Sequence, residues 1–288
     1  MKHYNCIFTG GSTRGLCYAG VLKALEEFNI EVDIHAGSSI GAIFLTFYAL
    51  GFTSDEIESE IDNLDLRKLF IDFNPYILSD FAFSKGNIYL KWLREKIESK
   101  YYGAKYKKGK MPPVCFKDID KELIIIATDL KTSNPVILSK ETTPNMELAL
   151  ALRITSSMPG LLKPVRYNNS ILIDGDILRG RPIWKTTDKL IREPHKLIEF
   201  RITGGNKNKL SQNPIKLVNA IVNAAAYNID SEAEIEYKNY INIIKIDVNN
   251  LLFTDFNLSI KRKKQIYKTG YETTMNYFTD KLYRNIKQ

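Results

Sequence analysis

The sequence predicts a layered α/β fold with a mostly parallel central sheet. The chain has 288 residues, 44% of them hydrophobic, which is enough to bury the core of one domain. Short apolar runs typical of buried strands alternate with longer stretches of helical periodicity from the N-terminus onward. Internal repeats and low-complexity linkers are absent from the sequence. We therefore expect residues 1–288 to form a single layered domain.

The order of the elements supports this prediction. Apolar, β-branched runs predict strands at residues 4–8, 32–36, 122–130, 135–139, 170–174, 197–203 and 240–248. Apolar positions at helical spacing predict helices at residues 16–28, 42–50, 53–64, 87–102, 146–154 and 213–229, followed by a mostly helical, basic C-terminal stretch. Thr53 and Glu56 have the spacing of a capping box, and Asn213-Pro214 is a typical helix start.

Cysteine and histidine usage indicates neither a disulfide framework nor a metal centre. The three cysteines are odd in number and show no CxxC spacing, a pattern typical of free thiols in a reducing compartment. The three histidines are scattered, so we expect no metal and no cofactor. The N-terminus lacks the features of a signal peptide, and residues 36–52 are too short and too rich in glycine and serine for a membrane helix. These features predict a cytoplasmic protein.

The net charge of +8 comes in part from two basic runs, residues 105–110 and 261–264. The runs are consistent with a solvated surface, with attraction to anionic lipid headgroups, or with nucleic-acid binding, and charge alone does not separate these. Residues 69–83 are dense in aromatic side chains. They are expected to be core or a packed surface loop, with a lid over an apolar channel as the alternative.

Residues 37–41, Gly-Ser-Ser-Ile-Gly, have the G-x-S-x-G pattern of a nucleophile elbow. In such an elbow the serine occupies a sharp turn between strand and helix, and glycines on both sides let the neighbouring backbone approach closely. The predicted strand before and helix after are the context that the motif requires. Ser39 is the candidate nucleophile, and Ser38 is expected to face the opposite way and to be only its neighbour. A simple strand-to-helix turn is the alternative.

No histidine is a convincing base for Ser39. An α/β-hydrolase order would use Ser39, Asp174 and then His195, but the elbow follows only two strands and His195 lies in a charged loop. Asp174 ends an apolar strand and is followed by Gly175, so a partly shielded carboxylate is a candidate base. A surface Asp-Gly turn is the alternative.

The segment from Thr9 to Gly15, "TGGSTRG", follows the first strand and opens a helix. Successive backbone N–H groups in such a turn bind anions, and facing an ester they would form an oxyanion hole. A phosphate-binding loop of the Walker type is excluded because no Lys-Ser/Thr pair follows Gly15. The dinucleotide pattern fits poorly, because Ser12 replaces its middle glycine.

Taken together, "GGSTRG", "GVLKALEE", "GSSIG" and "SSMPGLLKPVRYNNSILIDGD" resemble the patatin-like phospholipase family. The resemblance covers about residues 5–185, and residues 186–288 are expected to complete the sheet and add C-terminal helices. It implies a patatin-like α/β/α fold and a lipid acyl hydrolase with a Ser–Asp dyad and no catalytic histidine. The site residues implied are the dyad Ser39 and Asp174; the oxyanion loop Gly10, Gly11, Ser12, Arg14 and Gly15; the elbow Gly37, Ser38, Ile40 and Gly41; and the aspartate motif Gly175 and Asp176.

Two positions depart from the family pattern. Ser12 stands where a third glycine is usual, and Asp176 stands where glycine or alanine is usual. A second carboxylate beside Asp174 would raise a pKa within the pair unless it points to solvent or meets Arg179 or Arg181.

The implied reaction is cleavage of carboxylic ester bonds in phospholipids or related acyl lipids, through an acyl-enzyme. The implied partner is lipid at a membrane surface with anionic headgroups nearby, bound by transient peripheral association; no nucleic acid is expected. The alternative is a catalytically weak or inactive lipid-binding module on the same fold.

Overall fold

The computed structural model of the chain describes residues 2–70, 72, 82–178, 188–193, 196–204, 241–249, 251 and 255–286. Its strands are β1 (Lys2–Phe8), β2 (Ile30–Ser38), β3 (Ala82–Ser84), β4 (Glu122–Asp129), β5 (Asn134–Ser139), β6 (Gly160–Leu162), β7 (Val165–Tyr167), β8 (Ser170–Asp174), β9 (Leu197–Thr203) and β10 (Asn242–Asp247). Its α-helices are α1 (Cys17–Glu27), α2 (Ser39–Ala49), α3 (Ser54–Asn63), α4 (Leu66–Phe70), α6 (Asn87–Tyr102), α7 (Leu148–Thr155), α8 (Asp188–Ile191) and α10 (Ile260–Ile286).

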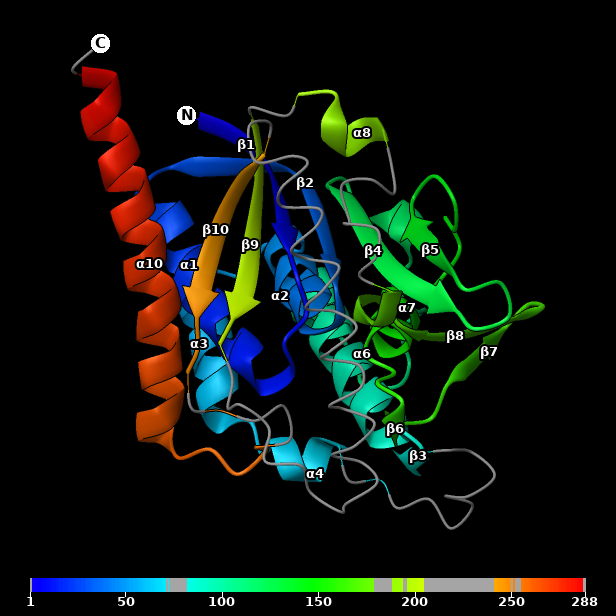
Figure 1. Cartoon of the computed structure of the whole chain (residues 1–288). Coiled ribbons are helices and arrows are strands. Elements are labelled where there is room, and N and C mark those ends of the chain that lie inside the picture. Colours follow the sequence, from blue (N-terminus) through cyan, green and yellow to red (C-terminus); the bar gives the residue numbers. More distant parts are fainter. Residues whose placement is uncertain are drawn as a thin grey trace.

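A mostly parallel sheet forms the centre of the protein (Figure 1). Its strands lie in the order β10-β9-β1-β2-β4-β8-β7, and β5 also pairs with β4. All pairs from β10 to β4 are parallel, whereas β5, β7 and β8 pair antiparallel with their neighbours. Short strands β3 and β6 form a separate parallel pair. The predicted fold class, a layered α/β protein with a mostly parallel sheet, is confirmed.

The hydrophobic core lies on both faces of this sheet because successive strand residues point to opposite sides. In β1, Cys6 and Phe8 pack into the large core with α1, α2 and α7, while Ile7 faces the other side. There Ile7 meets Ile124 and Ile126 of β4 and Leu190 of α8 in a second cluster.

Most of the predicted elements occur where the sequence indicated, with shifts of a few residues at their ends. The helix of the elbow begins at Ser39, three residues earlier than expected, and the short strands β3, β6 and β7 were not predicted. The helix predicted at residues 213–229 lies outside the described residues, as does most of the aromatic segment 69–83. The predicted capping box of α3 is present: the Thr53 hydroxyl accepts from the Glu56 N–H, and the Glu56 carboxylate accepts from the Thr53 N–H.

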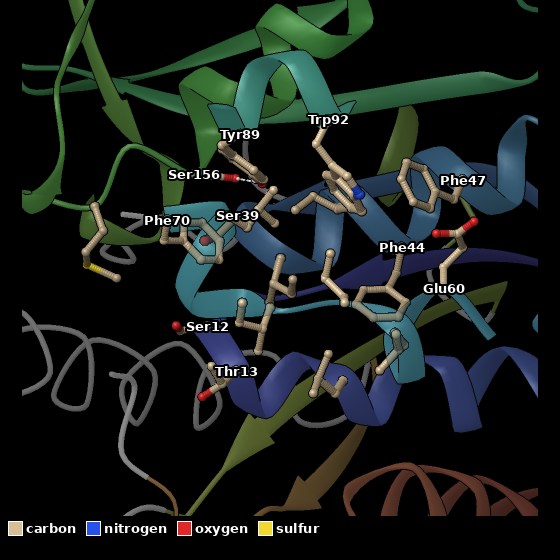
Figure 2. A pocket seen from close by; sticks show the side chains of 18 of the residues that line it. Ser12, Thr13, Ser39, Phe44, Phe47, Glu60, Phe70, Tyr89, Trp92 and Ser156 are labelled. Atoms are coloured by element: carbon tan, nitrogen blue, oxygen red, sulfur yellow. Dashed lines mark hydrogen bonds between the residues drawn. The ribbon is translucent and has the colours of Figure 1, made fainter. Parts of the chain in front are cut away.

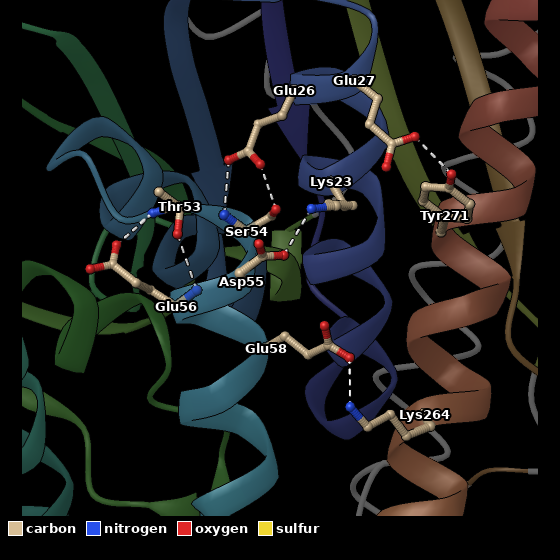
Figure 3. Close-up of polar contacts among 10 residues, drawn as sticks. All are labelled: Lys23, Glu26, Glu27, Thr53, Ser54, Asp55, Glu56, Glu58, Lys264 and Tyr271. Atoms are coloured by element: carbon tan, nitrogen blue, oxygen red, sulfur yellow. Dashed lines mark hydrogen bonds and ion pairs between the residues drawn. The ribbon is translucent and has the colours of Figure 1, made fainter.

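Polar contacts join helix α3 to α1 and to α10 (Figure 3). Lys23 and Glu26 of α1 bond Asp55 and Ser54 of α3. Lys264 of α10 bonds Glu58 of α3, and Tyr271 of α10 bonds Glu27 of α1. These contacts fix the orientation of α3, whose opposite face lines the cavity described below.

The basic run at residues 261–264 is used largely within the protein. Lys263 is only 6% exposed, and its ammonium donates to the carbonyls of Ile61, Asp62 and Leu64 at the end of α3. Carbonyls at a helix C-terminus lack partners in the helix, so this lysine caps α3. Lys264 forms ion pairs with Glu58 and Asp62. Lys263 is therefore neither part of a solvated surface nor available to attract anionic lipid headgroups, the two roles considered for this run.

No helix in the described ranges is both long enough and apolar enough to cross a bilayer.

Candidate active site

Ser39 occupies a strained turn at the junction of β2 and α2. Its φ is +48°, in the left-handed region that residues with a side chain rarely adopt. The flanking glycines allow the turn because nearby backbone leaves no room for a side chain. A β-carbon at Gly41 would lie 2.3 Å from the Phe8 carbonyl oxygen, and one at Gly37 would lie 2.8 Å from the Ala42 nitrogen. The local geometry is that of a nucleophile elbow.

The register of the sheet brings Asp174 to Ser39. Ser38 at the end of β2 is paired with Ile126 of β4, and the next residue of β4, Ala127, is paired with Asp174 at the end of β8. The Ser39 hydroxyl donates to Asp174 Oδ2 at 2.7 Å. Both side chains are buried, Ser39 at 7% exposure and Asp174 at 0%. A hydroxyl and a carboxylate in this contact are suited to transfer a proton between them.

The residues after Asp174 pack closely against β4 and the elbow. A β-carbon at Gly175 would lie 2.1 Å from the Ile126 carbonyl oxygen, so only glycine allows this approach. The Asp176 N–H donates to Asp174 Oδ1 at 2.9 Å, and the Asp176 side chain accepts a hydrogen bond from the Ser38 hydroxyl at 2.6 Å.

One sequence expectation, on Ser38, needs correction here, and one alternative left open for Asp176 is decided. Ser38 is more than a neighbour of the predicted nucleophile, because its hydroxyl bonds Asp176. Asp176 does not point to solvent either: it is 9% exposed and turned toward the elbow. Arg179 and Arg181, the partners considered for it, lie outside the described residues.

The glycine-rich loop lies directly against the elbow. A β-carbon at Gly10 would lie 2.9 Å from the Ser39 β-carbon, one at Gly15 would lie 2.3 Å from Ile40 Cγ2, and one at Gly11 would meet Ile202 of β9. Ser12 has a φ of +52°, a left-handed backbone conformation that favours glycine. This conformation accounts for the glycine that is usual at this position in the family pattern. The Arg14 guanidinium donates to the carbonyls of Gly11 and Gly204, which holds the loop against the end of β9.

Thr155 is a site residue that the sequence analysis missed. Its hydroxyl accepts from the Ser39 N–H at 2.9 Å and donates to the Ile126 carbonyl at 2.5 Å. It thus fixes the backbone of the strained turn. Thr155 is the last residue of α7 and directly precedes the segment "SSMPGLLKPV". This position in the sequence is the one feature from which its role could have been predicted.

A buried arginine supports the other side of Asp174. Arg153 donates to the Ser157 hydroxyl at 2.6 Å and to the carbonyls of Lys85 and Lys163. The Ser157 carbonyl in turn accepts from the Asp174 N–H at 3.1 Å. Burial lowers the pKa of Arg153 to about 10.

The histidines in the described ranges are not placed to act on Ser39. His35 is buried in β2 with Nδ1 3.3 Å from the Glu122 carbonyl oxygen, and burial lowers its pKa from 6.5 to about 4. His3 bonds Asp33 on the surface. His195, the base of the triad alternative, lies outside the described residues.

An apolar pocket opens beside Ser39 and Asp174 (Figure 2). Its empty volume is about 990 Å³, including the part open to solvent. One wall is the face of α2 that carries Ile40, Ile43, Phe44 and Phe47. The other lining side chains come mainly from α3, α4, α6 and the segment after α7, among them Ile57, Leu64, Phe70, Tyr89, Trp92 and Met158. Such a lining suits a hydrocarbon chain better than a polar ligand. No cluster of metal-binding side chains occurs in the described part of the chain.

Comparison with known proteins identifies the family. Residues 7–186 match the sequence model described as Patatin-like phospholipase, which takes in the glycine-rich loop, the elbow and the aspartate motif. The chain belongs to the patatin-like phospholipase family. A relative in Bacillus subtilis, the uncharacterized protein YqhO, is 26% identical over 93% of this chain and 95% of its own length.

The chain is also similar to a viral protein and to a protein of known structure. A protein of invertebrate iridescent virus 6, described as a probable lipid hydrolase, is 26% identical over 63% of each chain. The crystal structure of VipD from Legionella pneumophila has the same fold, with a TM-score of 0.62 at 17% identity, over 95% of this chain and 66% of VipD. The patatin-like fold implied by the sequence motifs is thus confirmed.

Proposed function

We propose that this patatin-like protein hydrolyses carboxylic ester bonds of phospholipids or related acyl lipids, with Ser39 as the nucleophile and Asp174 as its base. The observation that carries the proposal is the 2.7 Å hydrogen bond from Ser39 Oγ to Asp174 Oδ2 in the lining of an apolar pocket. A nucleophile bonded to a base is the arrangement that acyl transfer requires.

In the proposed reaction, Asp174 takes the proton of the Ser39 hydroxyl as Oγ attacks the ester carbonyl carbon. The negative charge that develops on the carbonyl oxygen is stabilised by backbone N–H groups of the loop at Gly10, Gly11 and Ser12. The carbon–oxygen bond to the alcohol then breaks, and the alcohol leaves with the proton held by Asp174. Water, deprotonated by Asp174, then attacks the acyl carbon. The bond from this carbon to Ser39 Oγ breaks, the proton held by Asp174 returns to Oγ, and the fatty acid is released.

The pocket supports an acyl substrate. Its wall on α2 runs from Ser39 to Phe47, eight residues or about 12 Å along the helix axis, so a chain bound to Ser39 would lie against this wall. The printed description of the viral relative, a probable lipid hydrolase, agrees with this substrate class. The proposal takes residues 1–288 as one catalytic domain, because β9 and β10 follow the family-matched segment and complete the sheet beside β1.

We also propose transient binding to a membrane surface, with anionic headgroups nearby. Phe83 of β3 is 46% exposed and Ile88 of α6 is 47% exposed. Register places Phe83 beside Leu161 of β6, which lines the pocket. Ile88 directly precedes Tyr89, which also lines the pocket. Exposed apolar side chains next to residues that line a pocket are suited to contact lipid.

The test uses soluble and phospholipid esters with Ser39→Ala, Asp174→Asn and, as matched control, Asp129→Asn. Asp129 is also a buried carboxylate at a strand end, but it bonds Ser170 and not the site. Ser39→Ala and Asp174→Asn should each abolish hydrolysis, and a fluorophosphonate should label Ser39, while Asp129→Asn and His195→Ala keep activity. Vesicle binding without any labelling of Ser39 would support the inactive lipid-binding alternative. Loss of activity in His195→Ala, with retention in Asp174→Asn, would support a histidine triad.

A further inference from the structure

A second serine–aspartate pair lies beside the first. The Ser38 hydroxyl donates to Asp176 Oδ1 at 2.6 Å, next to the bond from Ser39 to Asp174. The two serines are consecutive, and the two aspartates are separated only by Gly175. Both members of the second pair are buried, so water does not compete for this hydrogen bond.

Asp176 contacts each of the three segments on which the proposed reaction depends. Its backbone N–H donates to Asp174 Oδ1, which leaves Oδ2 of that carboxylate to accept from Ser39. Its side chain is held by Ser38, the residue immediately before the strained turn.

The third contact is with the glycine-rich loop. A β-carbon at Gly10 would lie 1.3 Å from Asp176 Oδ2, so the carboxylate fills the space that a side chain at Gly10 would need. Since Gly10 also lies against Ser39, the Asp176 carboxylate is packed between the elbow and the start of the proposed oxyanion loop. A glycine at position 176 would leave this space unfilled and Ser38 without its acceptor.

We propose that Asp176, held by Ser38, is a positioning residue that fixes the nucleophile, the base and the oxyanion loop relative to one another. The proposal rests on the proposed function. The reacting atoms must be aligned to within a fraction of an ångström, and a displacement of about 1 Å costs on the order of a hundredfold in rate. Removal of the hydrogen bond between Ser38 and Asp176 should therefore lower kcat and leave KM nearly unchanged, because the substrate pocket itself is not altered.

The experiment measures kcat, KM and the rate of fluorophosphonate labelling with a soluble p-nitrophenyl ester for Ser38→Ala, Asp176→Ala, Asp176→Asn and the Ser38→Ala/Asp176→Ala double variant. We expect both single alanine variants to lose roughly 10- to 100-fold in kcat and in labelling rate, with KM within about threefold. The double variant should lose little more than the worse single one, because both remove the same hydrogen bond. Asp176→Asn keeps an oxygen acceptor of the same shape for Ser38 and should retain at least about a third of kcat.

Ser54→Ala is the matched control. Ser54 is also a buried serine bonded to a carboxylate, that of Glu26, at the contact between α1 and α3. It should lower Tm as much as Ser38→Ala does and leave kcat unchanged, because the backbone N–H at position 54 keeps its own hydrogen bond to Glu26 and holds α3 in place. Should Asp176→Ala fail to fold, Ser38→Ala removes the same bond with the loss of one oxygen atom.

Three outcomes would overturn the positioning role: unchanged kcat in Ser38→Ala, an Asp176→Asn variant as impaired as Asp176→Ala, or independent losses that multiply in the double variant. Each of these leaves Ser39-dependent hydrolysis intact, so it is distinguishable from failure of the proposed function. A wild-type protein that neither hydrolyses esters nor reacts with the fluorophosphonate would overturn both.

Discussion

Replacing Thr155 by valine should loosen the strained turn at Ser39. Valine has nearly the shape of threonine but neither donates nor accepts, so the substitution removes two hydrogen bonds without opening a cavity. The Ser39 N–H then loses its acceptor and the Ile126 carbonyl loses a donor, both in a buried setting.

The size of the effect follows from these two contacts. A buried donor left without a partner costs about 1–3 kcal/mol, and the loss of the second bond adds about 1 kcal/mol. The free energy of unfolding should therefore fall by roughly 2–4 kcal/mol, which corresponds to a decrease in Tm of about 5–15 °C for a chain of this size. Because Ser39 has a φ of +48°, loss of the bond that holds its backbone should also lower kcat by about tenfold or more.

The assay is thermal unfolding together with ester hydrolysis, for Thr155→Val, Thr155→Ser and Thr128→Val. Thr155→Ser keeps the hydroxyl and should stay close to wild type. Thr128 of β4 is equally buried, but its hydroxyl has no hydrogen-bond partner among the described residues. Thr128→Val should therefore be neutral or stabilising.

A Thr155→Val variant as stable and active as Thr128→Val would refute the reasoning. It would mean that the Ser39 backbone is fixed by the glycine contacts of the elbow alone.

Three further predictions concern a buried histidine, two exposed apolar side chains and a close-packed glycine. Burial lowers the pKa of His35 from 6.5 to about 4, so between these pH values the unfolded chain binds a proton that the folded protein does not. The free energy of unfolding should therefore fall by up to about 3 kcal/mol as the pH decreases from 6.5 to 4. His35→Asn should reduce this pH dependence, measured by urea unfolding. Phe83→Ser with Ile88→Ser should lower hydrolysis of phospholipid vesicles about tenfold while hydrolysis of a soluble ester stays unchanged. Gly175→Ala should cost about 3 kcal/mol or more of stability, measured by chemical denaturation, and abolish ester hydrolysis, because its methyl group would meet the Ile126 carbonyl and displace Asp174.

Each of these predictions has a result that would contradict it. For His35, it is an equal pH dependence in the wild type and His35→Asn. For the membrane contact, the control is Ile260→Ser, which removes another exposed apolar side chain on α10; an equal loss with this variant would show that surface hydrophobicity in general matters. For Gly175, it is an alanine variant with wild-type stability.

Much of the fold could be predicted because it depends on local patterns. Strand–helix alternation, the capping box at Thr53 and Glu56, and the apolar runs of β4 and β9 are properties of neighbouring residues, and the structure contains them. The short strands β3, β6 and β7 escaped prediction because three residues are too few for a period to appear. The role of Lys263 escaped as well, because its three acceptors lie about 200 positions earlier in the chain.

The amino-acid sequence is sufficient to predict the family, the order of the longer elements, and the two residues, Ser39 and Asp174, on which the proposed function rests. Tertiary structure alone decided the hydrogen bonds around them, whose partners are 116 to 138 positions apart. Pairing of β4 with both β2 and β8 brings those positions together, and no local propensity encodes that register. For this reason Ser38, Thr155 and Asp176 acquire their contacts only in the folded chain.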